Sequence, residues 1–170
     1  INSLRDTMHS HDRVCVLEVM GRHCGDIALY SGVAGGAEFI LLPEKPFDLS
    51  EVAAELNKSY ARGKTSNMII LAEGAGNRDE IVNYLSEKTG LSIKTIVLGH
   101  IQRGGAPSLS DRILAAKFGN RAVDCLQKGD PSCVIGIRDN KIIEVDFEEV
   151  FNVKKQFDED LYETARILGL

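Results

Sequence analysis

Short apolar segments rich in β-branched residues recur along this chain, and each has the length of a single strand. These segments are residues 13–20, 37–43, 67–73, 93–99, 132–138 and 141–146. The middle four lack a clean alternation of apolar and polar positions. Because that pattern is typical of strands buried on both faces, it predicts a parallel sheet.

Helix-like patterns lie between and after these segments, at residues 26–36, 48–63, 77–90, 110–129 and 158–170. Asp48 and Ser110 are placed to start two of these helices. Three helices are followed by a glycine that can end them in the left-handed conformation, namely Gly63, Gly90 and Gly129. The alternation predicts a doubly wound, Rossmann-like α/β fold with three αβα layers and a mostly parallel sheet.

Polar residues follow three of the predicted strands directly. Met20, Gly21 and Arg22 come after the first strand and Glu73 after the third. The segment GHIQRGG, residues 99–105, comes after the fourth. Doubly wound folds bind ligands beyond the carboxyl ends of their strands, so we expect a binding site where these loops meet.

The first and third strand ends each leave two interpretations open. Gly21 lets the backbone turn sharply, and Arg22, near a helix start, can hold a phosphate through two hydrogen bonds. The alternative is an ordinary surface arginine after a tight turn. Glu73 can accept hydrogen bonds from sugar hydroxyls, or it can cap the helix that starts near Asn77.

The segment 99–105 carries the sharpest signal. His100 and Gln102 can reach hydroxyl or phosphate oxygens, and Arg103 adds a positive charge. The alternative is a loop in which His100 is a satisfied core residue. Because two cations suit a phosphate and a nearby carboxylate suits hydroxyls, the three loops together predict a sugar phosphate as the ligand class.

Composition narrows the function classes. The net charge of −5 argues against a general nucleic-acid-binding surface. No apolar run reaches the ~18 residues of a membrane span, and no signal peptide is recognisable, so no membrane partner is expected. The four cysteines form no C-x-x-C pair, which predicts reduced, structural thiols in a cytoplasmic protein. Residue 1 is Ile, and residues 1–12 read as the end of a polar segment, which favours a fragment of a longer chain.

Four stretches of the chain form a specific combination: RVCVLEVMGRHCGD, GGAEFILLPE, AEGAG and VLGHIQRGGAPSLSDRILA. In this order they strongly resemble the C-terminal half of the bacterial ATP-dependent 6-phosphofructokinase family. The resemblance implies a glycolytic enzyme that transfers the γ-phosphoryl group of ATP, with Mg²⁺, to the 1-hydroxyl of fructose 6-phosphate. It also implies a homotetramer.

The resemblance implies residue roles as well. Arg22 would be catalytic, because it would help to neutralise the transferring phosphoryl group. The residues that would bind fructose 6-phosphate are Arg13, Met20, Gly21, Arg22, Glu73, Lys94, His100, Ile101, Gln102 and Arg103. Arg13 and Lys94 would act in a neighbouring subunit. Lys94 stands where the family has an arginine; lysine lacks the planar fork, so we expect a looser grip on the 6-phosphate.

A second set of residues resembles the family's effector site, which binds ADP or phosphoenolpyruvate between subunits. Its members in this sequence are Arg5, Gly36, Glu38, Arg62 and Lys64. Glu38 would lie by the magnesium of a bound nucleoside diphosphate, and the three cations would hold phosphates. The alternative is ordinary surface charge on the segment YARGKT.

Two motifs of the family's N-terminal half do not occur in these 170 residues. The Gly-Gly-Asp-Gly loop and the T-I-D-x-D segment supply the nucleotide cradle, magnesium ligands and base of phosphoryl transfer. We therefore expect the main ATP site in an absent N-terminal half and no turnover by this chain alone. By resemblance, residues 1–101 with 153–170 would form the fructose-6-phosphate and effector domain, and residues 102–152 would return to the nucleotide-binding domain.

Three other interpretations remain. A pyrophosphate-dependent relative would differ in its phosphoryl donor, which the absent half selects. A non-catalytic module would bind a sugar phosphate or a nucleotide without turnover. A nicotinamide-dependent oxidoreductase is poorly supported, because no G-x-G-x-x-G follows the first strand.

Overall fold

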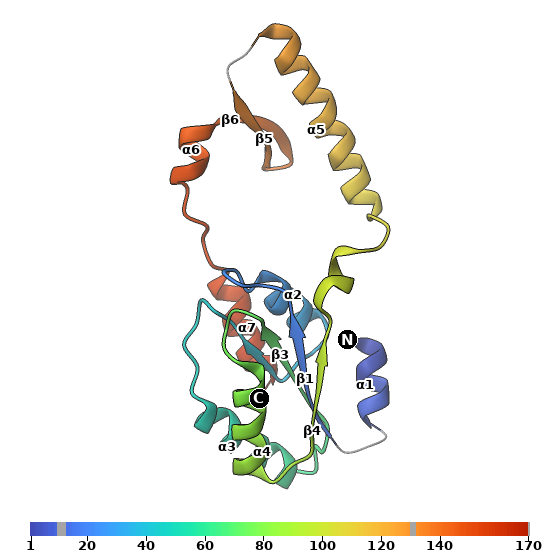
Figure 1. The fold of residues 1–170 in the computed structure, drawn as a ribbon, viewed down its shortest axis with the longest axis vertical. Coiled ribbons are helices and arrows are strands. Elements are labelled where there is room, and N and C mark those ends of the chain that lie inside the picture. Colours follow the sequence, from blue (N-terminus) through green and yellow to red (C-terminus); the bar gives the residue numbers. More distant parts are fainter. Residues whose placement is uncertain (10–12, 130–131, 170) are drawn as a thin grey trace. The chain divides into compact units, whose positions relative to one another are not determined.

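The computed structural model describes residues 1–9, 13–129 and 132–169. The chain divides into two compact units (Figure 1). Unit 1 comprises Ile1–Gly104 and Phe157–Leu170, and unit 2 comprises Gly105–Gln156. Each unit has a sheet of its own.

Unit 1 is built on four strands: β1 (Val14–Val19), β2 (Phe39–Leu41), β3 (Asn67–Ala72) and β4 (Ile93–Val97). They lie in the order β2-β3-β1-β4, and every pairing is parallel. All residues of the central β3 are buried, as its continuous apolar sequence predicts. The edge strand β4 is only partly covered, so its burial is lower than the sequence predicts.

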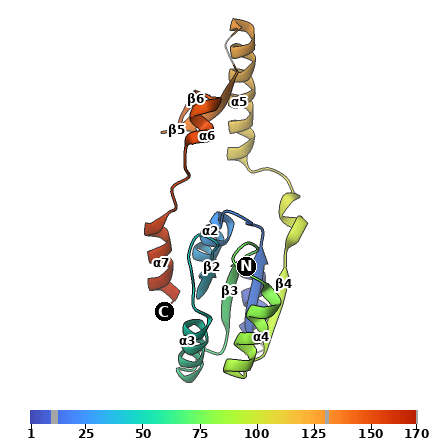
Figure 2. The ribbon, with the colours of Figure 1, turned by 60° about the vertical axis from the view of Figure 1, so that its left-hand side comes forward.

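Two helices cover one face of this sheet (Figure 2), α3 (Leu49–Ala61) and α4 (Arg78–Thr89). Leu56 of α3 and Leu85 of α4 are fully buried and pack in one cluster with Ile69 of β3. This cluster removes one side of the sheet from water.

Three helices cover the opposite face, α1 (Asn2–His9), α2 (Asp26–Ala34) and α7 (Glu159–Gly169). Leu29 of α2 packs there against Ile70 of β3, and both side chains are fully buried. Because successive residues of a strand point to opposite faces, Ile69 packs in the first cluster and Ile70 in the second. Helices on both faces of a parallel sheet confirm the predicted doubly wound αβα fold.

Helix ends follow the predicted chemistry with one shift. The Asp48 carboxylate accepts a hydrogen bond from the backbone N–H of Ser50 at 2.7 Å and caps α3. Gly90 ends α4 in the left-handed conformation, with φ of +69°. The long helix starts earlier than Ser110, because Ser108 and Asp111 form a capping box.

Unit 2 contains four elements: α5 (Leu109–Lys128), β5 (Cys133–Arg138), β6 (Lys141–Asp146) and α6 (Phe147–Asn152). The two strands form an antiparallel hairpin. The assignment of residues 132–138 to the parallel sheet was therefore wrong.

The reason for that difference is the connection between β5 and β6. Asp139 and Asn140 both have positive φ, +50° and +61°, which is the geometry of a two-residue hairpin turn. A two-residue connection forces antiparallel pairing, whereas a parallel pair needs a long crossover. The Asp-Asn pair was the signal in the sequence for this hairpin.

Three short elements were not predicted from the sequence: α1, α6 and the 3₁₀ helix η1 (Gly99–Arg103). Helix α1 occupies most of a segment whose composition is polar, yet its Leu4 and Met8 pack against the buried cluster that contains Leu29. No helix among the described residues is both long and apolar enough to cross a membrane.

The burial of side chains in the central sheet can be tested by mutation. Leu17 of β1 is fully buried, so Leu17→Ala is expected to lower the free energy of unfolding by about 2–5 kcal/mol. Leu168→Ala is the matched control, because that side chain is 69% exposed, and it is expected to change stability by less than about 0.5 kcal/mol. Urea denaturation measures both, and equal effects would contradict this packing.

Candidate functional site

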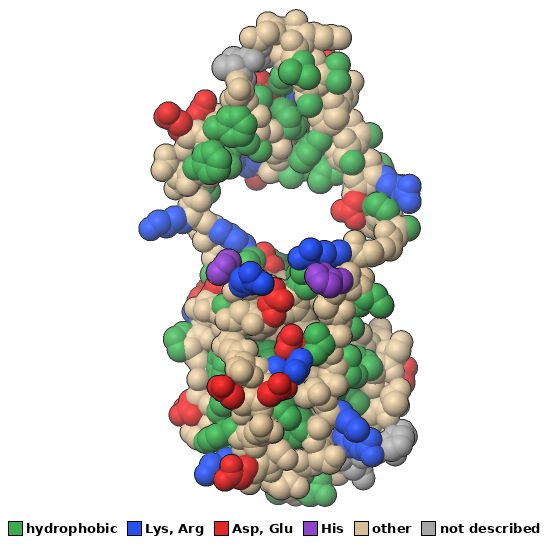
Figure 3. All heavy atoms as spheres, in the orientation of Figure 1, with side chains coloured by type: hydrophobic (Ala, Val, Ile, Leu, Met, Phe, Trp, Pro, Cys, Tyr) green, Lys and Arg blue, Asp and Glu red, His purple; other side chains and the backbone are tan. Residues whose placement is uncertain are grey.

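The three polar loops predicted from the sequence lie side by side, because the strands that they follow are neighbours in the sheet. β1 lies between β3 and β4, with Val19 opposite Ala72 and Glu18 opposite Val97. The loops thus leave the sheet at one edge, here called the rim: residues 20–22, Glu73 and η1. Figure 3 shows Lys, Arg and His side chains together with acidic ones at an end of this unit.

Backbone and side-chain hydrogen bonds tie the rim loops together. The N–H of Glu73 donates to the carbonyl of Val19 at 2.9 Å, so parallel pairing continues past the end of β3. The N–H of Met20 donates to the Gln102 side-chain oxygen at 2.8 Å. Gln102 was predicted as a ligand contact, but this oxygen is used to connect η1 to the first loop, a role that the sequence did not reveal.

Two glycines are required where the first and third loops approach each other. Gly21 has φ of +143°, and a Cβ there would lie 2.6 Å from the carbonyl oxygen of Cys24. A Cβ on Gly74 would lie 1.8 Å from the carbonyl oxygen of Arg22. Any side chain at Gly74 would therefore displace the backbone that carries Arg22.

The charged side chains of the rim are exposed and available to a ligand. Arg22, Glu73, His100 and Arg103 are all exposed. Within the described parts of the chain, these four side chains make no hydrogen bond or ion pair. Since His100 is exposed, it is not the buried core histidine of the alternative interpretation. Ile101 is 76% exposed beside it.

The structure argues against one of the two interpretations of Glu73, a cap of the following helix. The cap of α4 is Asn77, whose side-chain oxygen accepts hydrogen bonds from the N–H groups of Asp79 at 2.9 Å and Glu80 at 3.3 Å. Glu73 is therefore not needed as a cap. Its carboxylate stays at the rim, beside the loop that carries Arg22.

Two predicted substrate residues lie at the other end of the sheet. Arg13 directly precedes β1, and Lys94 is the second residue of β4, opposite Cys15. A strand of this length places them roughly 15–20 Å from the rim. Within one copy of unit 1 the structure does not bring them to the rim.

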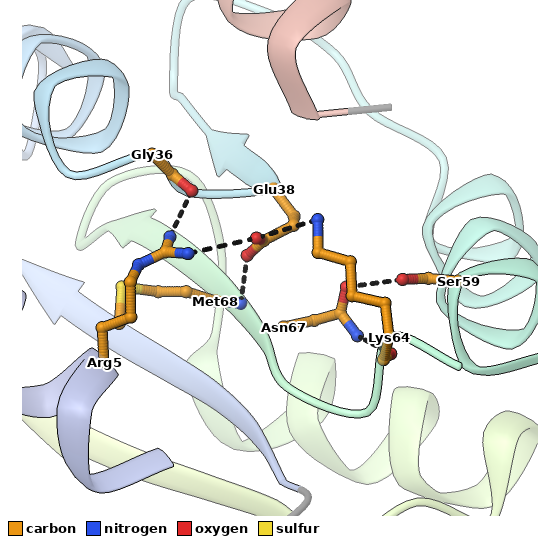
Figure 4. A network of polar contacts seen from close by, with 7 residues as sticks. All are labelled: Arg5, Gly36, Glu38, Ser59, Lys64, Asn67 and Met68. Atoms are coloured by element: carbon orange, nitrogen blue, oxygen red, sulfur yellow. Dashed lines mark hydrogen bonds and ion pairs between the residues drawn. The ribbon is translucent and has the colours of Figure 1, made fainter. Parts of the chain in front are cut away.

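Four of the five residues predicted for the effector set lie together (Figure 4). Arg5, Gly36 and Lys64 surround Glu38, and these four residues are here called the Glu38 cluster. The Glu38 side chain is only 4% exposed, and its carboxylate forms ion pairs with Arg5 at 3.5 Å and Lys64 at 3.1 Å. The guanidinium of Arg5 also donates to the carbonyl of Gly36. The N–H of Met68 donates to the second carboxylate oxygen at 2.6 Å.

Neighbouring polar residues hold this Glu38 cluster in place. Asn67 is buried, accepts a hydrogen bond from the Ser59 hydroxyl at 2.9 Å and donates one to the carbonyl of Lys64 at 3.3 Å. Arg62, the fifth predicted residue, lines a cavity of about 140 Å³ together with Lys64. The sequence analysis missed Asn67, although a polar residue at the head of a fully apolar strand was a signal.

A larger cavity of about 440 Å³ lies elsewhere in unit 1. It is lined by β2, the start of α3 and α7, and by none of the rim residues. We therefore place the candidate site by the chemistry of the rim and not by cavity size.

The fold and the rim define a doubly wound α/β protein with a candidate ligand site at the carboxyl ends of its strands. A family model described as phosphofructokinase matches residues 1–126, and the chain belongs to this family. The family inferred from the sequence motifs is thereby confirmed.

Individual relatives agree with this assignment. The chain is 49% identical over 169 residues to an ATP-dependent 6-phosphofructokinase of Clostridium botulinum, covering 99% of this chain and 53% of the relative. The crystal structure of Pichia pastoris phosphofructokinase in the T-state matches with a TM-score of 0.78 and 32% identity, over 98% of this chain and 20% of that one.

A second solved structure carries a different name. The pyrophosphate-dependent phosphofructokinase from Nitrosospira multiformis matches with a TM-score of 0.77 and 26% identity. That match covers 92% of this chain and 46% of the other. The chain spans about half the length of the curated relatives that it matches.

The close approach of Gly74 to Arg22 can be tested by adding one methyl group. Gly74→Ala is expected to lower the free energy of unfolding by about 1–3 kcal/mol and to speed amide hydrogen exchange in residues 20–24. Gly76→Ala is the control, because its Cβ would meet only the Ile81 side chain, at 3.3 Å. Unchanged exchange in the Gly74 variant would show that the two loops are not packed as described.

Proposed function

We propose that this chain is the C-terminal portion of an ATP-dependent 6-phosphofructokinase. The complete enzyme transfers the γ-phosphoryl group of ATP to the 1-hydroxyl of fructose 6-phosphate. One observation carries the proposal: three neighbouring parallel strands deliver Arg22, Glu73, His100 and Arg103 to one rim, with their side chains uncommitted. ATP and Mg²⁺ would be held by the N-terminal half.

The rim side chains suit the separate demands of this reaction. Arg103 and His100 would bind the 6-phosphate of the sugar, and Glu73 would accept hydrogen bonds from its hydroxyls. Arg22 would stabilise the negative charge of the transferring phosphoryl group, an interaction that counts most when it is pre-positioned. The contact between Gly74 and the Arg22 backbone supports such pre-positioning.

Arg13 and Lys94 would complete the site of a neighbouring subunit in a homotetramer. Their position at the far end of the sheet, away from their own rim, supports this proposal. A cross-subunit contact would make fructose 6-phosphate affinity sensitive to subunit arrangement. Such sensitivity suits an allosteric enzyme.

The Glu38 cluster would be the effector site. The Glu38 carboxylate would bind the metal ion of a nucleoside diphosphate. Arg5, Arg62 and Lys64 would bind its phosphates. Phosphoenolpyruvate would bind through these three cationic side chains alone. The existing ion pairs support a site in which the effector replaces interactions among the protein's own charges.

Unit 2 would belong to the nucleotide-binding domain of the complete enzyme, with residues 102–152 as its approximate bounds. Several large apolar side chains of this unit are exposed, namely Ile113, Val123, Leu126, Phe147 and Phe151. Burial of these side chains against the N-terminal half would stabilise both parts. A cytoplasmic location stays a prediction.

The catalytic role of Arg22 can be tested in the complete enzyme. Arg22→Ala is expected to lower kcat about 10²–10³-fold, because a charge that stabilises the transition state is lost. Arg166→Ala is the control, since this exposed residue of α7 lies outside the rim, and it should leave kcat unchanged. A coupled assay of ADP formation measures both, and an unchanged kcat in the Arg22 variant would contradict the role.

The division of labour between the halves gives a second test. The 170-residue chain is expected to show no ATP-dependent phosphorylation of fructose 6-phosphate, whereas the complete enzyme should be active with ATP. Turnover by the chain alone would refute the proposed fragment. Activity of the complete enzyme with pyrophosphate in place of ATP would assign it to the pyrophosphate-dependent type.

A further inference from the structure

Unit 2 holds two cysteines and a glutamate that three different elements bring together. Cys125 lies in the last turn of α5, Cys133 begins β5 and Glu144 lies in β6. The two sulfur atoms and a carboxylate oxygen all lie within 4.8 Å of one another. Neither the rim nor the Glu38 cluster includes any of them, so the proposed function leaves them unexplained.

The hairpin register accounts for the meeting of these side chains. Cys133 is opposite Asp146 and Ile135 is opposite Glu144. Because alternate residues of a strand share a face, Cys133 and Glu144 point to the same side of the hairpin. Helix α5 packs on the hairpin and supplies Cys125, which is 7% exposed.

A cation from the same helix orients the carboxylate. Arg121 precedes Cys125 by one helical turn and forms an ion pair with Glu144. A carboxylate has two oxygens, so Glu144 can pair with Arg121 and still offer an oxygen to a metal ion. This arrangement matches metal sites in which a neighbouring group positions a ligand through its second atom.

The donor set points to one class of ligand. Two cysteine sulfurs and a carboxylate oxygen are ligands of Zn²⁺, which prefers four ligands in a tetrahedron.

We propose that Cys125, Cys133 and Glu144 form a binding site for Zn²⁺, a divalent cation of borderline softness, with a fourth position open to water. Binding replaces the thiol protons with metal–sulfur bonds and releases them to solvent. The site joins the end of α5 to both strands of the hairpin. The bound ion would therefore stabilise unit 2 without taking part in phosphoryl transfer.

Cobalt titration of the reduced 170-residue chain tests the site directly. Co²⁺ is expected to bind one site with a thiolate-to-cobalt absorption band, and Zn²⁺ should abolish that band. Cys125→Ser and Cys133→Ser should each weaken the band strongly, and Glu144→Gln should lower Co²⁺ affinity about tenfold or more. Absence of the band in the unaltered chain would overturn the proposal.

A matched control separates this site from a second group of candidate ligands among the described residues. Cys24 lies near Asp26 and Glu44 in unit 1, within the same 4.8 Å limit. Because the proposed site lies in unit 2, Cys24→Ser should keep the full cobalt band. Loss of the band in this variant would assign the metal to unit 1 and overturn the proposal.

Alkylation of the unaltered chain gives a readout that does not depend on variants folding. Cys24 and Cys133 are both half-buried cysteines. Zn²⁺ should slow iodoacetamide labelling of Cys133, located by mass spectrometry, and leave that of Cys24 unchanged. Equal labelling of Cys133 with and without Zn²⁺ would contradict the site.

Discussion

The parallel pairing of β1 with both β3 and β4 is the constraint on which the rest of unit 1 depends. Parallel strands end at the same edge, so the three loops after them must emerge together. The register places Val19 beside Ala72, and the next residue on each strand is already a rim residue. Apolar burial on both faces of the sheet thereby fixes the position of polar groups that contribute nothing to the core.

The rim is stabilised by contacts that leave its charged side chains unpaired. The loops are tied through the Met20 N–H, the Gln102 oxygen and the close contact between Gly74 and the Arg22 backbone. None of these contacts involves the guanidinium or carboxylate groups of the rim side chains. An exposed charge without a partner costs little in water and retains its full interaction for an incoming anion.

In the Glu38 cluster, by contrast, the charged side chains are paired with one another. Glu38 is a buried carboxylate, and a buried charge without partners would destabilise the fold by several kcal/mol. Arg5, Lys64 and the Met68 N–H supply that compensation. The two groups of residues therefore differ physically: the charged side chains of the rim are unpaired, whereas those of the cluster are paired with one another.

The sequence by itself determined the layered α/β fold, the positions of most elements and the rim residues. Strand periodicity, helix caps and polar residues after apolar runs are local signals, and local chemistry produces them. Tertiary structure alone decided the order β2-β3-β1-β4, the role of Gln102, the direct ion pair of Arg5 with Glu38 and the meeting of Cys125 with Glu144. Each of these joins residues distant in the chain, and only the packing of helices and strands into layers sets those distances.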